Sequence, residues 1–246
     1  MLLQFNILSW SAWSPAYQQN ASWRDWQKAT AAQSLDNSAP SLSQVPSMQR
    51  RRFSRLSKMM LHVAFAADAP PQCHSIFASR HGELNRTIGL LEDIIAKQPL
   101  SPTAFSQSVH NTASGLFGIV SGNQQASTSI AAGSETLAQA MVEAYAQLAS
   151  GDKPVLLVYG DDPVPPIYDA YTDELEYPLA LAMLLTNKEA EANAVAQLSI
   201  DTHGASQPPH SALCYGELLQ ALATQQPIAG QIGRQQWQLS FGAVHE

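Results

Sequence analysis

The pattern of apolar and polar residues divides the chain into short apolar runs and longer segments in which apolar residues recur three and four positions apart. The short runs predict buried strands, and the longer segments predict helices with one buried face. The predicted strands cover residues 2–10, 73–79, 126–131, 154–160, 177–186, 195–200 and 235–241. The predicted helices cover residues 49–67, 83–97, 111–122, 134–149 and 210–225, with a short helix near residues 23–31. For residues 177–186, a helix is the competing interpretation.

This alternation of strand and helix predicts an α/β layered fold with a mixed sheet and helices on both faces. We expect a single domain over residues 1–246. Within it, residues 1–187 hold the regular core, and residues 188–246 form a short irregular remnant.

Composition and charge narrow the function classes. The 246 residues are 45% hydrophobic and 13% charged, which suits a globular protein with a substantial core. The net charge of −7 argues against nucleic acid as a partner. Two cysteines far apart in the sequence, Cys73 and Cys214, argue against a disulfide framework. The first residues lack a signal-peptide pattern and no stretch is long enough to cross a bilayer, so we expect a cytoplasmic protein without a membrane span.

Four arginines gather at the start of the predicted helix 49–67, at Arg50, Arg51, Arg52 and Arg55. A charge run of this kind is typical of a solvated helix face. It also suits the docking of an acidic partner such as an acyl carrier protein. Both interpretations stay open.

A tight turn, Ala131-Ala132-Gly133-Ser134, joins the predicted strand 126–131 to the predicted helix 134–149. Such a corner places one side chain at a helix N-terminus, where backbone N–H groups and the helix dipole favour negative charge. Enzymes use such a corner for a Ser or Cys nucleophile. The residues around Ser134 do not form the G-x-S-x-G motif, and Ser is a preferred N-cap residue. We therefore favour a helix cap at Ser134 over a nucleophile.

The remaining polar clusters predict no metal site and no cofactor. The seven histidines form neither HExxH nor a Cys/His zinc spacing, and His110 is expected to be a hydrogen-bonded core histidine. The sequence contains no P-loop and no G-x-G-x-x-G motif for a nucleotide. An acidic run is expected to form a solvated loop, and it comprises Asp161, Asp162, Asp169, Asp173, Glu174 and Glu176.

Residues 111–134 resemble the β-ketoacyl synthases of fatty-acid and polyketide assembly. Asn111, a Gly-containing helix, a short strand over residues 127–130 and the turn at Ser134 follow one another in that family's order, without a gap. Ser134 falls where the family has its nucleophilic cysteine. Three further blocks resemble the β-ketoacyl-synthase-like N-terminal domain and, within it, the chain length factor subunits of bacterial aryl polyene pathways. These blocks are MQRRRFSR from residue 48, SRHGEL from residue 79 and SPTAFSQSVHN from residue 101.

The resemblance covers about residues 2–187 and implies a thiolase-like fold whose second half is truncated. A working synthase needs a thiolate to hold the acyl chain and two histidines from its second half. Here Ser134 replaces the cysteine, and His203, His210 and His245 sit in no matching motif. The resemblance therefore implies a non-catalytic subunit, in a heterodimer with a catalytic β-ketoacyl synthase that receives its substrate from an acyl carrier protein. In that role the chain would set product length by shaping the acyl tunnel.

The same resemblance implies that the strand 126–131 pairs with the partner subunit and that the helix 111–122 lies near the interface. The implied tunnel and interface residues are Ala104, Phe105, Leu116, Phe117, Ile119, Val120, Thr128, Ser129 and Ile130. Two other function classes stay open. The chain would then be a serine acyltransferase or hydrolase that uses Ser134, or a purely stabilising scaffold subunit of a ketosynthase.

Overall fold

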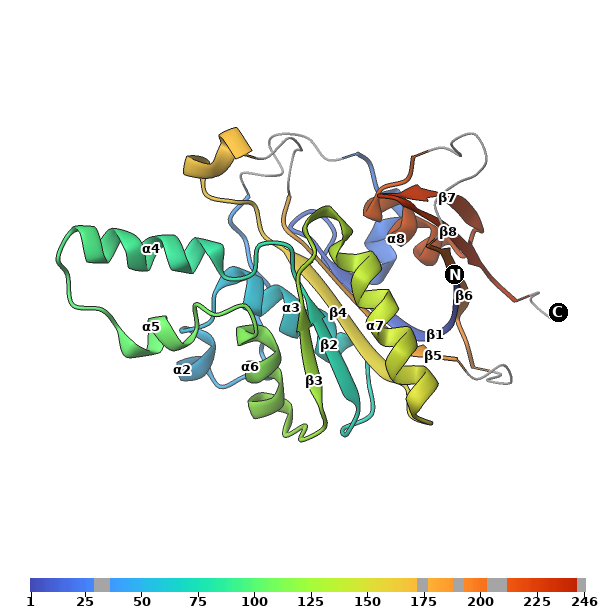
Figure 1. Cartoon of the computed structure of the whole chain (residues 1–246), viewed down its shortest axis with the longest axis horizontal. Coiled ribbons are helices and arrows are strands. Elements are labelled where there is room, and N and C mark those ends of the chain that lie inside the picture. The colour runs from blue at the N-terminus through green and yellow to red at the C-terminus, as the bar shows by residue number, and fades with distance from the viewer. Residues whose placement is uncertain (29–35, 172–176, 188–192, 203–211, 243–246) are drawn as a thin grey trace.

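The computed structural model describes residues 1–28, 36–171, 177–187, 193–202 and 212–242. Strands from the beginning to the end of this described part form one mixed sheet (Figure 1). The strand order among these residues is β3-β2-β4-β5-β1-β6-β8-β7. The strands are β1 (Leu2–Trp13), β2 (His74–Ala78), β3 (Ser127–Ile130), β4 (Val155–Asp161), β5 (Leu179–Thr186), β6 (Ala196–Asp201), β7 (Ile228–Ile232) and β8 (Gln235–Ser240). The predicted mixed sheet is confirmed, and residues 177–186 contribute a strand rather than a helix.

The parallel part of the sheet is confined to β2, β3 and β4, and the other neighbouring strands pair antiparallel. The carboxyl ends of these three parallel strands therefore lie at one edge of the sheet. In the middle of the sheet, β1 lies between β5 and β6, and thereby joins the first part of the chain to the last.

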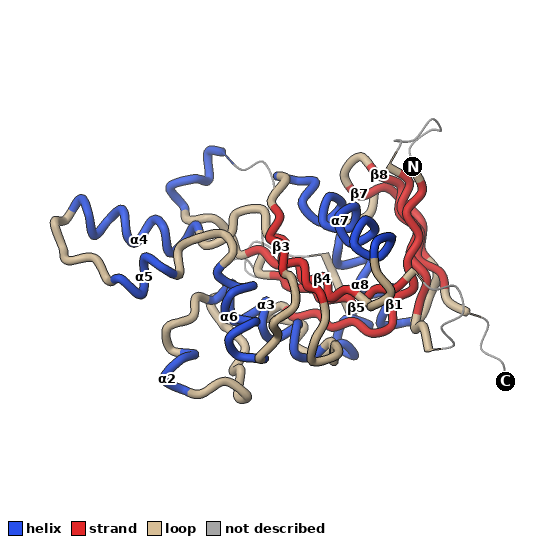
Figure 2. The backbone as a smooth tube through the Cα atoms, turned by 60° about the horizontal axis from the view of Figure 1, so that its bottom comes forward, coloured by secondary structure: helices blue, strands red, loops and turns tan. Residues whose placement is uncertain are grey.

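Helices cover both faces of the sheet over its first half. The helices are α2 (Ser47–Arg50), α3 (Arg55–Ala66), α4 (Leu84–Ile95), α5 (Pro102–Ser106), α6 (Thr112–Ser121), α7 (Thr136–Ser150) and α8 (Tyr215–Thr224), with 3₁₀ segments η1 (Asn20–Asp25), η2 (Gly133–Glu135) and η3 (Pro166–Tyr171). One core lies between the sheet and α7 with α8, and the other lies between the sheet and α3 with α6. The sheet bends strongly between its two halves, and α7 and α8 lie on the concave side of the bend (Figure 2).

The predicted helix 49–67 is wrong as a single element. It is divided into α2 and α3 by a turn in which Phe53 is buried and the Ser54 hydroxyl accepts a hydrogen bond from the Ser57 amide at 2.9 Å. The backbone of Ser54 is extended, as is usual for an N-cap residue, so α3 starts only after it. The helical spacing of apolar residues continues through the turn, and for this reason periodicity alone does not show the break.

The expectation of an irregular remnant at the C-terminal end is also wrong. Residues 196–240 supply β6, α8, β7 and β8, which extend the sheet. The helix α8 packs against η1, where Arg24 Nε donates to Ala223 O at 3.1 Å and Gln220 donates to Arg24 O at 3.0 Å. β7 has no sequence signal strong enough to predict it, because it is short and contains Gly230 and Gln231.

The short helix expected near residues 23–31 is the 3₁₀ segment η1 at residues 20–25, and residues 29–31 lie outside the described residues. Also outside them lie Asp173, Glu174, Glu176, His203, His210 and His245.

Candidate functional site

The turn that leads from β3 to α7 lies at the carboxyl ends of the parallel strands β2, β3 and β4. Glu135 N donates to Ala132 O at 3.1 Å, and Gly133 has a φ of +58°. Thr136, which is 1% exposed, holds the corner: its hydroxyl accepts from Ala132 N at 2.9 Å and donates to Gly133 O at 2.7 Å. A buried threonine hydroxyl therefore fixes the turn from the inside.

Ser134 is not the helix cap that the sequence indicates. The side chain is exposed, and among the described residues none forms a hydrogen bond with its hydroxyl. The interpretation as a cap was wrong because Thr136 already binds the free backbone groups of the turn. A serine nucleophile needs a base within hydrogen-bond reach, and no histidine or carboxylate of the described part of the chain bonds to Ser134.

His110 is the histidine closest to Ser134 in sequence, and it holds a loop rather than acting as a base for that serine. Its Nε2 lies 2.9 Å from the carbonyl oxygen of Ser79, and a carbonyl only accepts, so Nε2 carries the proton. The ring therefore holds the loop that follows β2, as expected for a structural histidine.

Asp161, at the end of β4, organises the same loop. Its Oδ1 accepts from the Ser79 hydroxyl and from the Arg80 amide, both at 2.8 Å, and its Oδ2 accepts from the Tyr159 hydroxyl at 2.6 Å. Burial raises the pKa of the Asp161 carboxyl, and the hydrogen bonds from Tyr159 and Ser79 oppose that rise. The prediction of a solvated acidic loop is therefore wrong for this residue.

Asp162 is also buried, and it forms an ion pair with Arg55, whose Nη2 lies 2.5 Å from Asp162 Oδ1. Burial raises the pKa of the Asp162 carboxyl, while the hydrogen bond and charge of Arg55 lower it. Next to this pair, Glu83 Oε1 accepts from the hydroxyls of Ser54 and Ser57, both at 2.7 Å. The pKa of Glu83 is raised by burial, against the effect of these two hydroxyls and of Arg86.

Two of the four arginines considered for carrier-protein docking have internal partners. Arg55 pairs with Asp162, and Arg50 Nη1 donates to the carbonyls of Ser41 and Leu42 at 3.2 and 3.3 Å. Arg51 and Arg52 are exposed.

The strand β3 is the edge of the sheet. It pairs with β2 only, in parallel register from Ser75–Ser127 to Ala78–Ile130. Its side chains alternate between the two helix layers: Thr128 accepts from Gln147 of α7 at 3.3 Å, whereas Ser129 bonds to Ser114 of α6 at 3.3 Å. The outer edge of β3 therefore keeps its backbone groups free of any strand among the described residues.

The interface residues that the resemblance implies on α6 differ in exposure: some pack in the core, and one faces solvent. Phe117 packs in the core, with ring centroids 5.5 Å from those of both Phe65 and Phe77. Leu116 and Val120 are half-buried against the same core. Ile119 is 75% exposed, and it lies one turn from Gly115, around which no atom stands within 4 Å of an added Cβ. Of the two residues named in α5, Ala104 is half-buried and Phe105 is 64% exposed.

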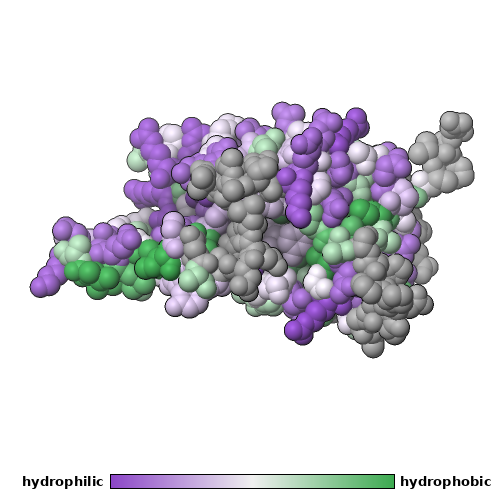
Figure 3. Space-filling view, turned by 90° about the horizontal axis from the view of Figure 1, so that it is seen from above, coloured by the Kyte–Doolittle hydropathy of each residue, from purple (hydrophilic) through white to green (hydrophobic). Residues whose placement is uncertain are grey.

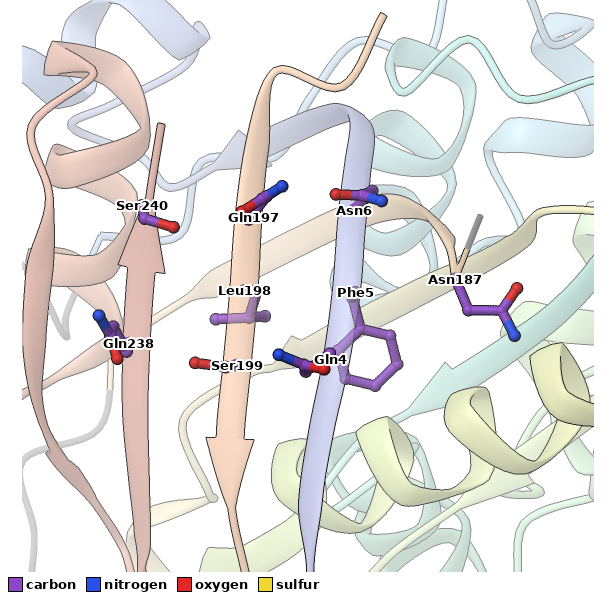
Figure 4. A pocket seen from close by; sticks show the side chains of 9 residues that line it. All are labelled: Gln4, Phe5, Asn6, Asn187, Gln197, Leu198, Ser199, Gln238 and Ser240. Atoms are coloured by element: carbon purple, nitrogen blue, oxygen red, sulfur yellow. The ribbon is translucent and has the colours of Figure 1, made fainter. Parts of the chain in front are cut away.

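A separate hollow of about 400 Å³ lies on the sheet face that no helix covers, across β1, β6 and β8 (Figure 4). Its lining is largely polar and comprises Gln4, Phe5, Asn6, Asn187, Gln197, Leu198, Ser199, Gln238 and Ser240. None of the residues implied for the tunnel lines it. Within the described residues, no group of His, Cys, Asp and Glu is arranged to hold a metal ion, and no helix there is long and apolar enough to span a bilayer.

Known structures share this architecture. A chain of the complex between the ketosynthase ApeO and its chain length factor ApeC from Xenorhabdus doucetiae is 25% identical, with a TM-score of 0.76; the match covers 97% of this chain and 99% of that chain. The ishigamide ketosynthase/chain length factor is 14% identical, with a TM-score of 0.64 and coverages of 80% and 65%. A β-ketoacyl synthase from Burkholderia phymatum is 14% identical, with a TM-score of 0.61 and coverages of 91% and 71%. These matches confirm the thiolase-like fold.

Two comparisons use the sequence alone. A search of curated proteins finds no match to the chain. The family model of the β-ketoacyl synthase N-terminal domain matches residues 23–240, which span most of the chain and include the turn at Ser134. The chain therefore belongs to the β-ketoacyl synthase N-terminal domain family.

Proposed function

We propose that the chain is a non-catalytic chain length factor, which pairs with a catalytic β-ketoacyl synthase and shapes the tunnel for the growing acyl or polyene chain. The observation that carries this proposal is the near-complete match, in both directions, with a chain of a ketosynthase–chain length factor complex. The two other ketosynthase structures described above are matched over only 65% and 71% of their chains.

The turn at Ser134 supports a role without catalysis. It keeps the corner on which a nucleophile would stand, but the side chain is a hydroxyl to which no base among the described residues is bonded. A serine without a matched base is a poor nucleophile at neutral pH. The histidine at hand, His110, donates to a backbone carbonyl and belongs to the loop after β2.

The free edge of β3 supports a partner that continues the sheet. An exposed edge strand is a template for pairing with another chain. β3 is short and rich in hydroxyl side chains, Ser127, Thr128 and Ser129, which bond inward to neighbouring elements and leave the outer edge open. We expect the catalytic synthase to bind there, beside Ile130 and the exposed face of α6.

The tunnel would then lie between the two subunits, with Ala104, Phe105, Leu116, Ile119 and Val120 on this side of it. Phe117 would act through the core behind α6, because it packs against Phe65 and Phe77. Tunnel depth sets product length by steric exclusion, since one ring occupies the volume of several methylenes. Aryl polyene biosynthesis in the cytoplasm is the expected setting.

Acyl carrier protein is the expected source of substrate for the pair. The exposed Arg51 and Arg52 supply positive charge for an acidic carrier, whereas Arg50 and Arg55 are held by internal partners. Replacement of Arg51 and Arg52 by Ala should slow turnover of carrier-bound substrate by the complex without changing product length.

The experiment that tests the proposal is co-expression with the cognate β-ketoacyl synthase. We expect a stable heterodimer by size-exclusion chromatography, and acyl products whose length shortens when Leu116 is replaced by Trp. Ser134→Ala should leave product formation intact. A stable pair whose product length no tunnel variant changes would favour a stabilising scaffold. An acyl adduct on Ser134, formed by the isolated chain with an acyl-carrier thioester, would favour the serine acyltransferase or hydrolase.

A further inference from the structure

The hollow on the open face of the sheet takes no part in the proposed function. Helices cover the first half of the sheet on both faces, whereas in the described part of the chain β6 and β8 are covered only on the face of α7 and α8. In the strand order, β6 and β8 lie towards the end opposite to β3, at which we expect the ketosynthase to bind. The hollow therefore lies apart from the expected subunit contact.

The polar side chains of the hollow stand in two rows of three that cross β1, β6 and β8 in register. The rows are Gln4–Ser199–Gln238 and Asn6–Gln197–Ser240 (Figure 4). Residues directly opposite each other on antiparallel strands have Cβ atoms about 4.5–5.5 Å apart. The six side chains, here called the polar platform, therefore form one continuous surface.

Most of the hydrogen-bonding groups of the polar platform have no protein partner. Apart from Asn6, its side chains form no hydrogen bond with any other described residue. Each amide offers both donors and an acceptor, and each hydroxyl does the same. Gln236 follows on the same face of β8, two positions before Gln238, and both polar atoms of its side chain are buried without a partner among the described residues. The open face therefore carries more hydrogen-bonding groups than the described chain pairs.

The polar platform is also uncharged. The lining of the hollow contains no Asp, Glu, Lys, Arg or His. On the same face of β6, Asp201 lies two positions beyond Ser199, and its Oδ1 is 3.7 Å from the N-terminal amine of Met1. A phosphate or carboxylate bound in the hollow would lose water without gaining a cation, and this loss is costly. The lining therefore favours a neutral ligand.

We propose that the polar platform binds an uncharged sugar of one or two rings. Sugar hydroxyls donate and accept at the same time, as do the amides and hydroxyls of the platform, so both sides can satisfy one another as they displace water. The volume of about 400 Å³ lies within the range of small-molecule sites. This inference does not depend on the proposed function.

The same surface is poorly suited to a protein partner. β1, β6 and β8 each pair with a strand on both sides, so the hollow offers no free strand edge to an extended peptide. The apolar lining residues Phe5 and Leu198 are 3% and 1% exposed and pack in the core of the opposite face. Protein interfaces depend on large anchor side chains. Exposed apolar side chains of that size lie on α4, at the other end of the molecule (left in Figure 3).

The test is saturation-transfer difference NMR on the full chain in complex with its cognate ketosynthase, with maltose, cellobiose and trehalose as probes. We expect at least one of these sugars to bind with a dissociation constant on the order of 1 mM, because hydrogen bonds exchanged with water are each worth little. Glucose 6-phosphate should give no transfer. Gln197→Ala together with Gln238→Ala should weaken binding at least tenfold, and Gln226→Ala, which is outside the hollow, should leave it unchanged. All three glutamines are exposed, so the melting temperature should stay the same in every variant.

Three results would overturn the proposal: no transfer to any of the three sugars, equal binding of glucose 6-phosphate, or undiminished binding by the double variant. The last result would place the sugar elsewhere on the complex. If the chain does not pair with the ketosynthase, the proposed function fails, and the same titration on the chain alone still decides whether the platform binds sugar.

Discussion

Gly233, at the tip of the β7–β8 hairpin, lies directly against Glu135, the residue that follows Ser134. A Cβ added at Gly233 would stand 2.6 Å from Glu135 Oε1, which is shorter than real Cβ contacts allow. The C-terminal hairpin therefore reaches back to the corner between β3 and α7. The last hairpin of the described chain therefore contacts the residue next to Ser134, nearly 100 positions earlier in the sequence.

Gly233→Ala should destabilise the fold. The residue has a φ of +60°, in the left-handed region that costs other residues roughly 1–2 kcal/mol, and the added methyl group also displaces Glu135. We expect a loss of at least about 1 kcal/mol in the free energy of unfolding, measured by urea denaturation. Gly242→Ala is the control, because no atom lies within 4 Å of its added Cβ. Equal stabilities of the two variants would show that the hairpin tip moves freely away from Glu135.

Thr136→Val should also cost stability, whereas Ser134→Ala should not. Valine keeps the shape of the buried threonine but loses the hydroxyl that bonds Ala132 N and Gly133 O. A buried donor or acceptor without its partner costs about 1–3 kcal/mol. The exposed Ser134 hydroxyl has no described partner, so its removal should change the free energy of unfolding by less than about 0.5 kcal/mol. The reverse order of the two effects would restore Ser134 as the helix cap.

The sequence predicts the sheet and most of the helices because their apolar periodicity is strong. β4 and β5 are almost continuously apolar, and α7 has a regular buried stripe. The break before α3 is not predicted, because the buried Phe53 continues the helical spacing across the turn. β7 is missed because a strand of five residues with a glycine depends on its pairing with β8.

The candidate site is predicted less well than the fold, for an electrostatic reason. Charged residues are assigned to solvent by default, yet Asp161 and Asp162 are held by partners that lie far away in sequence. Ser79 and Arg55 stand 82 and 107 positions earlier in the chain. Only the parallel pairing of β2 with β4 brings Ser79 to Asp161, and a single sequence does not contain that register.

Gly115→Ala separates the stability of the chain from its affinity for the partner. Alanine is better than glycine in a helix by up to about 1 kcal/mol. Apart from the backbone of α6 itself, no atom of the described residues stands within 4 Å of a Cβ added at Gly115. The isolated chain should therefore become more stable. If the partner backbone approaches α6 closely at Gly115, the same methyl group should weaken the heterodimer. The free energy of unfolding and the dissociation constant should be measured on the same preparation. A higher free energy of unfolding with an unchanged or lower dissociation constant would exclude close packing of the partner at this face.

The wild-type protein should lose stability, relative to Glu83→Gln, as the pH rises above the ordinary pKa of a glutamate, about 4.3. Burial raises the pKa of this carboxyl in the folded chain above its ordinary value. Between the unfolded and the folded pKa, the native state therefore binds more protons than the unfolded state, and the free energy of unfolding falls with rising pH. The contribution is fully present below the unfolded pKa and is lost as the pH passes the folded pKa.

Urea denaturation at a series of pH values gives the wild-type free energy of unfolding minus that of Glu83→Gln, and this difference should decrease steadily as the pH rises. The exposed Glu92→Gln should show no such trend. A difference that grows with pH would mean that the hydroxyls of Ser54 and Ser57, together with Arg86, outweigh burial and lower the pKa of Glu83.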